Sequence, residues 1–369
     1  MRLGRLGLIV VLLLAGTILA CTAPAAGTPP PAPQQTAALA REATPAAAAA
    51  PAAAMSAPTA PPRVRVAMAY SVLSGDPLPM LIAQDQGFFE RHGVEADLTY
   101  IGGSTRITEA IIAGEIKLAQ IGGAAAVSAG LSGADVIMIG TVVPVFVTTL
   151  FSRPEITSVA DLRGKSIAVT AIGTTTDFAG RVALRRAGLE PLRDVAIIQA
   201  GGAPEVLAAI QAGNVAGGVL TAPNTLRARE AGLRELVDLT ALRIPYEQAP
   251  LGTTRRFIEE QPATVRAFLR AITEGIAVAK QDRALAKRVL ARYTRVEDDA
   301  LLEETYRLYV EDALPRAPYV TREGVQTILD LLDHPRAPEA TPEQFFDNRF
   351  VQELDRSGFI DSLYPTPQR

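Results

Sequence analysis

The chain has 369 residues, a formal net charge of −3 and 48% hydrophobic residues. The hydrophobic fraction excludes a fully disordered chain, and the slightly acidic balance excludes a general nucleic-acid-binding surface. The single Cys excludes a disulfide framework and a thiolate metal cluster, and only two His argue against a histidine-based metal site or catalytic triad. At about 150 residues per domain, the length predicts two folded domains.

The first 21 residues are typical of a bacterial lipoprotein signal. Residues 1–5 are short and basic, and residues 6–20 are mostly apolar. This apolar run is shorter than the about 20 residues that a membrane-spanning helix needs. Ile18-Leu19-Ala20-Cys21 resembles a lipobox, although Leu19 departs from the small or hydroxylated residue preferred there. We therefore expect residues 1–20 to be a signal peptide and Cys21 to be lipidated; the alternative is ordinary secretion with Cys21 incidental.

Residues 21–62 have the composition of a tether. The 41 residues after Cys21 include 18 Ala and 10 Pro and carry only two charges, Arg41 and Glu42. Such a composition buries no core, and repeated Pro interrupts helices. We expect a disordered, semi-extended link between a membrane anchor and the folded body.

Residues 63–139 alternate between strand and helix patterns. The expected strands are 63–70, 94–101, 115–121 and 135–139, and the expected helices are 79–89, 104–113 and 124–131. The alternation predicts a parallel sheet with right-handed crossovers.

The same rhythm returns in the second half. The expected strands there are 166–171, 195–199 and 215–220, and the expected helices are 174–187, 204–212 and 223–231. Gly201-Gly202 and Ala212-Gly213 follow Gly102-Gly103 and Ala113-Gly114 by 99 residues each (201 minus 102, 212 minus 113). This repetition favours two lobes built on one plan over a single large sheet.

After residue 250 the pattern becomes helical. Five apolar residues at helical spacing indicate one buried helix face: Val265, Phe268, Leu269, Ile272 and Ile276. Further helices are expected at 284–293, 298–310, 322–332 and 342–354, with Thr321 and Thr341 as N-terminal caps. Because no strands alternate with them, we expect these helices to cover an existing lobe.

The residues favour binding over catalysis. The chain contains no P-loop, no dinucleotide-binding glycine pattern after a strand and no HExxH motif. What remains is a set of polar helix starts after strands, which suit an anion or a polar acceptor. Open α/β sheets bind ligands at the carboxyl ends of their strands. The candidate ligand-binding residues are Tyr70, Ser71, Gly103, Ser104, Gly123, Thr174, Thr175, Thr176, Gln199 and Asn224. A capping role for Thr174, completed by Asp177, is compatible with binding.

Four separate segments resemble the nitrate/sulfonate/taurine-type substrate-binding proteins of ABC importers, a group that includes binders of thiamine-pyrimidine precursors. Residues 82–94 read IAQDQGFFERHGV, residues 158–169 read SVADLRGKSIAV, residues 208–213 read AAIQAG and residues 264–271 read TVRAFLRA. The resemblance extends over about residues 63–310.

The resemblance implies an α/β fold of the type II periplasmic-binding-protein class, with two similar lobes, a ligand cleft and a hinge. Lobe 1 would comprise 63–150 and 250–369, including the C-terminal helices, and lobe 2 would comprise 151–249. The chain would cross between lobes near 148–153 and 245–254. Ligand binding would close the hinge, and the closed form would dock on a membrane permease that works with an ATPase. We expect a monomer, at the outer face of the cytoplasmic membrane or in the periplasm.

The expected ligand is a small organic anion or polar solute, such as a sulfonate, nitrate or a carboxylate. The clearest candidate loops hold no basic residue except Arg106, which argues against a dianion. The alternatives are a pyrimidine-type thiamine precursor, or a solute sensor that is not coupled to transport. An enzyme of the same fold with a Cys-rich segment is disfavoured, since the body has no Cys. We expect no cofactor, no metal and no catalytic residue.

Overall fold

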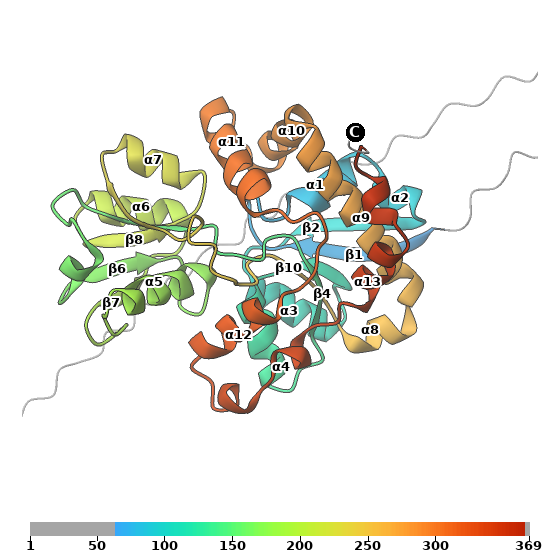
Figure 1. Cartoon of the computed structure of the whole chain (residues 1–369), viewed down its shortest axis with the longest axis horizontal. Coiled ribbons are helices and arrows are strands. Elements are labelled where there is room, and N and C mark those ends of the chain that lie inside the picture. Colours follow the sequence, from blue (N-terminus) through green and yellow to red (C-terminus); the bar gives the residue numbers. More distant parts are fainter. Residues whose placement is uncertain (1–62, 366–369) are drawn as a thin grey trace, which may run out of the picture. The chain divides into compact units, whose positions relative to one another are not determined.

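The computed structural model describes residues 63–365 (Figure 1). The expected signal peptide, Cys21 and the tether lie outside the described residues. The folded body contains two five-stranded sheets, each with helices packed on it, and we refer to the two sheets with their helices as the first and second lobes. Among residues 63–365, no helix is both long and apolar enough to cross a bilayer.

The first sheet has the order β2-β1-β3-β10-β4. Its strands are β1 (Val64–Tyr70), β2 (Val94–Tyr100), β3 (Leu118–Gln120), β4 (Ile137–Thr141) and β10 (Pro250–Thr253). Its connecting helices are α1 (Leu78–Asp85), α2 (Phe88–Arg91), α3 (Ser104–Ala113) and α4 (Gly123–Leu131). β1 pairs in parallel with β2 and β3, whereas β10 pairs antiparallel with β3 and β4.

The second sheet has the order β7-β6-β8-β5-β9. Its strands are β5 (Thr149–Ser152), β6 (Ser166–Val169), β7 (Ala196–Gln199), β8 (Gly217–Leu220) and β9 (Arg234–Asp238). Its main helices are α5 (Thr175–Arg186), α6 (Ala203–Gln211) and α7 (Asn224–Glu230). β6 pairs in parallel with β7 and β8, and β5 pairs antiparallel with β8 and β9.

The two sheets share one topology, as the repeated glycine pairs predict. The repeated strands are β1, β2, β3 and β4 in the first sheet and β6, β7, β8 and β9 in the second. In each sheet the first of the four lies between the second and the third, and the fourth lies at the far edge. The strand between the third and the fourth is the one that enters from the other lobe, β10 or β5. The expectation of purely parallel sheets is therefore wrong, because these two short crossing strands are antiparallel. β9 was also not expected, and its exposed polar residues conceal the alternation of a strand.

Helices after β10 cover the first lobe, as expected (Figure 1). They are α8 (Arg255–Glu260), α9 (Pro262–Gln281), α10 (Arg283–Thr294), α11 (Asp299–Tyr306), α12 (Arg322–Leu331), α13 (Arg349–Arg356) and α14 (Phe359–Ser362). α9 contacts α1, and α12 contacts α4. The five apolar residues predicted to form one face of α9 are all buried.

Three expected helices are each divided in two. The helix expected at 79–89 breaks at Gly87, whose φ of 67° is left-handed. The one expected at 298–310 continues from α11 into a π-helical turn, Arg307–Ala313. The one expected at 342–354 is a 3₁₀ turn, Pro342–Phe345, followed by α13. Thr321 caps α12 as predicted, whereas the Thr341 side chain makes no capping bond.

Two segments carry the chain between the lobes: residues 142–148, the first crossing, and residues 239–249, the second crossing. They run side by side, because the Tyr246 N–H donates to the Pro144 carbonyl at 3.0 Å and the Gln248 N–H donates to the Val143 carbonyl at 3.0 Å. The rings of Phe146 and Tyr246 stack with centroids 4.0 Å apart. The crossings therefore form one short ribbon rather than two independent linkers.

Glu247 fixes the second crossing to the first lobe. Its Oε1 accepts from the Thr321 N–H at 2.8 Å and from the Thr321 hydroxyl at 2.6 Å, at the start of α12. Its backbone carbonyl accepts from the Gly123 N–H at 2.9 Å, at the start of α4. Complete burial raises the pKa of this carboxyl from 4.5 to about 7, against the opposing effect of the Thr321 donors.

The raised pKa of Glu247 predicts a pH-dependent stability. Its protonation favours the folded state, so this contribution is complete below pH 4.5, falls as pH rises, and is lost above about 7. The size is roughly 3 kcal/mol at most. Glu247→Gln retains an acceptor for Thr321 but does not titrate. We expect the wild-type stability, relative to the variant, to fall between these pH values in urea unfolding. Parallel pH profiles for the two proteins would contradict the prediction.

Candidate functional site

The candidate residues of the first lobe gather at the carboxyl ends of three adjacent strands. Tyr70 is in register with Tyr100 of β2 and with Gln120 of β3. Gln120 is buried, and its Oε1 accepts from both the N–H and the hydroxyl of Ser71 at 3.2 Å. The Ser71 carbonyl in turn accepts from the Gly103 N–H at 3.1 Å. Gln120, which the sequence analysis did not select, holds this edge together.

The start of α3 joins the same cluster. The Ser104 hydroxyl accepts from the Gly122 N–H at 2.8 Å, so it ties the loop after β2 to the loop after β3. A Cβ on Gly123 would lie 2.4 Å from the Glu247 carbonyl, so the backbone that comes close to this glycine is the second crossing. Gly103 has a φ of 96° with open space around its Cβ position. Of Gly103, Ser104 and Gly123, Gly103 therefore leaves the most room for a ligand.

An aromatic cluster borders this edge. The Tyr70 ring lies 5.4 Å from that of Tyr100 and meets the Tyr293 ring edge-on at 6.4 Å. Tyr70 is buried, whereas Tyr100 is 45% exposed. Burial raises the pKa of Tyr70, so its phenol stays neutral and acts as a hydrogen-bond donor or acceptor.

In the second lobe, three threonine hydroxyls form a closed cluster before α5. Thr170 and Thr176 are 2.8 Å apart, Thr174 and Thr176 are 3.1 Å apart, and Thr170 and Thr174 are 3.2 Å apart, measured between Oγ1 atoms. Thr174 also donates to the Ala171 carbonyl at 2.7 Å. Thr174 and Thr176 therefore shape the loop, and Thr174 makes no side-chain capping bond to the helix.

The charge at this helix start is compensated. Asp177 is buried, accepts from the Gly173 N–H at 2.9 Å and pairs with Arg181 at 2.8 Å. Gln199 Oε1 accepts from the Ile172 N–H at 3.3 Å, which fixes the loop to the end of β7. The expected cap of Thr174 with Asp177 is not formed, because Asp177 accepts from Gly173, the residue before the cap position. The ion pair with Arg181 leaves the start of α5 without a net side-chain charge.

Thr175 differs from its neighbours because it lies next to Tyr246 of the second crossing. Tyr246 is fully buried, and its ring also meets Phe178 of α5 at 6.3 Å. Burial raises the pKa of Tyr246, while the nearby Thr175 side chain acts in the opposite direction. The Tyr246 hydroxyl makes no hydrogen bond to any residue in 63–365. Among the three consecutive threonines, Thr175 is the one whose side chain lies near Tyr246, without reaching hydrogen-bond geometry.

Asn224 opens α7 at the end of the third parallel strand and is buried. Its Oδ1 accepts from Arg227 at 3.4 Å. The nearby Arg229 pairs with Glu235 of β9 at 2.9 Å and with Glu304 of α11. Arg106 is exposed, as expected.

Several buried polar atoms around the two crossings have no hydrogen-bond partner within the described part of the chain. They are Thr141 Oγ1, Thr148 Oγ1, Thr225 Oγ1, the Tyr246 hydroxyl and Glu247 Oε2. Thr141 lies near Glu247 and favours its charged form, without reaching hydrogen-bond geometry. Buried polar groups are normally satisfied, so such a group marks a place where a further partner would be accepted. The sequence analysis did not select these residues, because nothing in the local sequence marks a buried polar atom without a partner.

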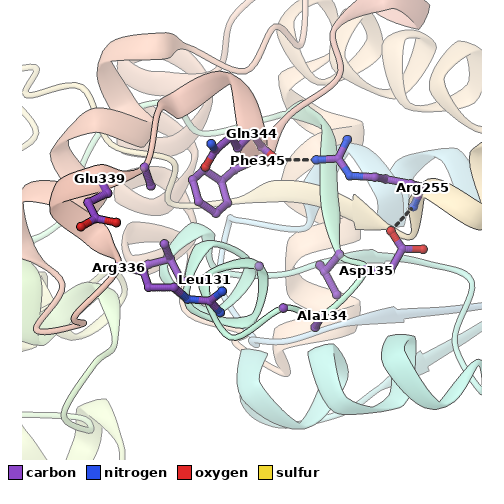
Figure 2. Close-up of a pocket in the computed structure, with 12 residues that line it drawn as sticks. Leu131, Ala134, Asp135, Arg255, Arg336, Glu339, Gln344 and Phe345 are labelled. Atoms are coloured by element: carbon purple, nitrogen blue, oxygen red, sulfur yellow. Dashed lines mark hydrogen bonds between the residues drawn. The ribbon is translucent and has the colours of Figure 1, made fainter.

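A pocket of about 500 Å³ lies elsewhere on the first lobe (Figure 2). It is lined by the end of α4 and the start of β4, at the opposite end of the strands from Thr141 and Gln120. Asp135 accepts from the Arg255 N–H at 3.1 Å, and the Arg255 guanidinium donates to the Gln344 carbonyl. Asp135, Arg255 and Gln344 are thus bonded to one another, and the pocket contains none of the candidate residues.

Solved structures share the fold at low sequence identity. A protein of Bordetella bronchiseptica RB50 aligns with a TM-score of 0.68 and 18% identity, over 80% of this chain and 98% of that one. The alkanesulfonate-binding protein SsuA of Xanthomonas axonopodis pv. citri, bound to MOPS, gives 0.62 and 20%, over 78% and 97%. The periplasmic nitrate-binding protein NrtA of Synechocystis PCC 6803 gives 0.64 and 14%, over 84% and 94%. These similarities establish the two-lobe periplasmic-binding-protein fold.

Sequence relatives agree with this assignment. A candidate binding protein of Brucella abortus (strain 2308) is 32% identical over 118 residues, which is 32% of this chain and 36% of the relative. The match thus spans only about a third of the length of that relative. The profile of the family described as "NMT1/THI5 like" matches residues 75–285, more than half of the chain and parts of both lobes. The chain belongs to the NMT1/THI5-like family.

Proposed function

We propose that the protein is an extracytoplasmic solute receptor of an ABC importer. It binds one small solute between the strand ends of its two lobes and delivers it to a membrane permease with its ATPase. The observation that carries the proposal is that both sheets place polar residues after the carboxyl ends of their parallel strands. These are Ser71 and Gly103 in the first lobe, and Thr175 and Asn224 in the second. The crossing ribbon between the lobes contains buried polar atoms without a partner in the described residues. The fold and the family support binding rather than catalysis.

The solute proposed is a monoanion or a neutral polar molecule, with sulfonate, nitrate and carboxylate groups as the main candidates. Backbone N–H groups at helix starts and hydroxyls bind such oxygens. Arg181 and Arg229 of the second lobe pair with carboxylates, and Arg227 donates to Asn224. A dianion would require free bases. The names of SsuA and NrtA point to the same chemical range.

A pyrimidine-type thiamine precursor is the second candidate. The cluster of Tyr70, Tyr100 and Tyr293 favours it, because a planar heterocycle stacks on aromatic rings. A sensor role without transport would use the same site, and an adjacent permease gene would separate the two.

A thermal-unfolding screen of the whole chain tests the proposed function. The probes are methanesulfonate, MOPS, nitrate, acetate, glycine and 4-amino-5-hydroxymethyl-2-methylpyrimidine, in a buffer free of sulfonates. A solute at 100 times its dissociation constant stabilises the folded state by about 2.7 kcal/mol. We expect one oxyanion class to raise the midpoint and the others to leave it unchanged. A shift with the pyrimidine alone would favour the second candidate, and no shift with any probe would contradict the proposal.

The double variant Thr174→Ala/Thr175→Ala tests where the solute binds. We expect at least tenfold weaker binding by calorimetry, because two hydroxyls at the start of α5 are lost. Thr327→Ala is the matched control, since that half-buried threonine donates only to the Glu323 carbonyl of its own helix. Equal affinities for all three proteins would place the site away from α5.

Lipid anchoring at Cys21 forms part of the proposal and is tested separately. Lipidation of a cysteine would hold the body at the outer face of the membrane. We expect Cys21→Ser to move the protein from the membrane fraction to the soluble extracytoplasmic fraction, and to abolish labelling with a radioactive fatty acid. Membrane retention of the variant would contradict the anchor and leave the receptor proposal intact.

A further inference from the structure

Tyr246 is the residue of the crossing ribbon that is best placed to contact a solute. The Tyr246 ring stacks on the Phe146 ring, with centroids 4.0 Å apart and planes at 13°, and its centroid lies 6.3 Å from that of Phe178. The Tyr246 backbone N–H donates to the Pro144 carbonyl at 3.0 Å. The hydroxyl therefore has a fixed position, and that position is beside Thr175 in the first turn of α5.

Thr174, Thr176 and Asp177, the neighbours of Thr175 in the chain, are already hydrogen-bonded. Thr174 and Thr176 bond to Thr170 and to each other, and Asp177 bonds to Gly173 and Arg181. The Tyr246 hydroxyl is fully buried and has no partner among residues 63–365. A buried hydroxyl without a partner weakens folding, because its hydrogen bonds to water are lost on burial. A bound acceptor would remove this cost.

Other buried tyrosines of this chain behave differently. Tyr309 donates to Asp76 Oδ2 at 3.2 Å, and Tyr306 donates to the Ala279 carbonyl at 3.0 Å. Both are almost as buried as Tyr246. Burial therefore does not by itself leave a tyrosine hydroxyl unpartnered, although the Tyr364 hydroxyl, outside the ribbon, also has no partner among residues 63–365.

We infer that the Tyr246 hydroxyl donates a hydrogen bond to an acceptor oxygen of the solute bound at the start of α5. This inference rests on the proposed function and names a contact that couples the solute to the interlobe ribbon. The α5 loop belongs to the second lobe, and Tyr246 is flanked by Glu247 and Gln248, which are bonded to the first lobe. A solute that bridges Thr175 and Tyr246 therefore contacts both the second lobe and the ribbon, whose next two residues are bonded to the first lobe.

Tyr246→Phe and Tyr306→Phe form a matched pair for the test. Both remove one buried hydroxyl and keep the ring. Without solute, we expect Tyr246→Phe to unfold at or above the wild-type urea midpoint, because no hydrogen bond is lost. Tyr306→Phe should unfold below it, because the bond to the Ala279 carbonyl is lost. Affinity is measured by calorimetry with methanesulfonate, nitrate and acetate as the probes.

We expect Tyr246→Phe to bind the probe that the wild type binds about ten- to a hundredfold more weakly. Tyr306→Phe should bind within twofold of the wild type. An unchanged affinity of Tyr246→Phe, or a loss of stability equal to that of Tyr306→Phe without a loss of affinity, would overturn the inference while the receptor function stands. If the wild type binds none of the three anions or any other probe of the screen, the proposed function fails, and this inference fails with it.

Discussion

The amide of Gln248 holds the molecule's two crossings in one place, and the arrangement of both lobes depends on it. Its Oε1 accepts from the Val147 N–H at 2.8 Å, and its Nε2 donates to Asp76 Oδ1 at 2.8 Å. Asp76 also accepts from Ser74 at 2.5 Å and from Tyr309. Burial raises the pKa of Asp76, and these donors act against that rise. Gln248 thus connects both crossings to Asp76 in the loop after β1, and Asp76 connects them to Tyr309 in the π-helical turn.

Three consecutive residues of the second crossing, Tyr246, Glu247 and Gln248, each contact a different part of the molecule. Tyr246 contacts the second lobe through Phe178 and Thr175, and Glu247 contacts the first lobe at the starts of α4 and α12. Gln248 then fixes the ribbon itself. The backbone turns at Glu247, because the Gln248 N–H donates to the Tyr246 carbonyl at 2.9 Å. The solute proposed here would be bound next to this segment, and its contacts would reach the interlobe ribbon directly.

The charge of the proposed site depends on ion pairs that form only in the folded chain. Arg181 compensates Asp177, and Arg229 is shared between Glu235 and Glu304. With those charges paired, the proposed site would rely on hydroxyls and on the N–H groups of helix starts, which would favour a singly charged or neutral solute. The sequence contains the same arginines, but their pairing depends on residues up to 75 positions away.

Much of the fold was predictable because it is local. The strand β1, the helix Ser104–Ala113 with its C-terminal glycine, and the buried face of α9 follow from spacing and from Gly114, since these patterns act within a few residues. The repeated glycine pairs also predicted that both sheets share one plan. Resemblance in four short segments predicted the family, which the match over residues 75–285 confirms.

The sequence by itself therefore determined the two α/β lobes, the helical C-terminal part and the loops that carry the candidate residues. Only the tertiary structure decided that β5 and β10 enter the opposite sheet antiparallel, that Gln120 and Gln248 bind the loops together, and that Tyr246 is buried beside Thr175. The physical reason is that strand pairing across a crossing, and the burial of a hydroxyl without a partner, are set by segments far apart in the chain. Local spacing contains no information about either.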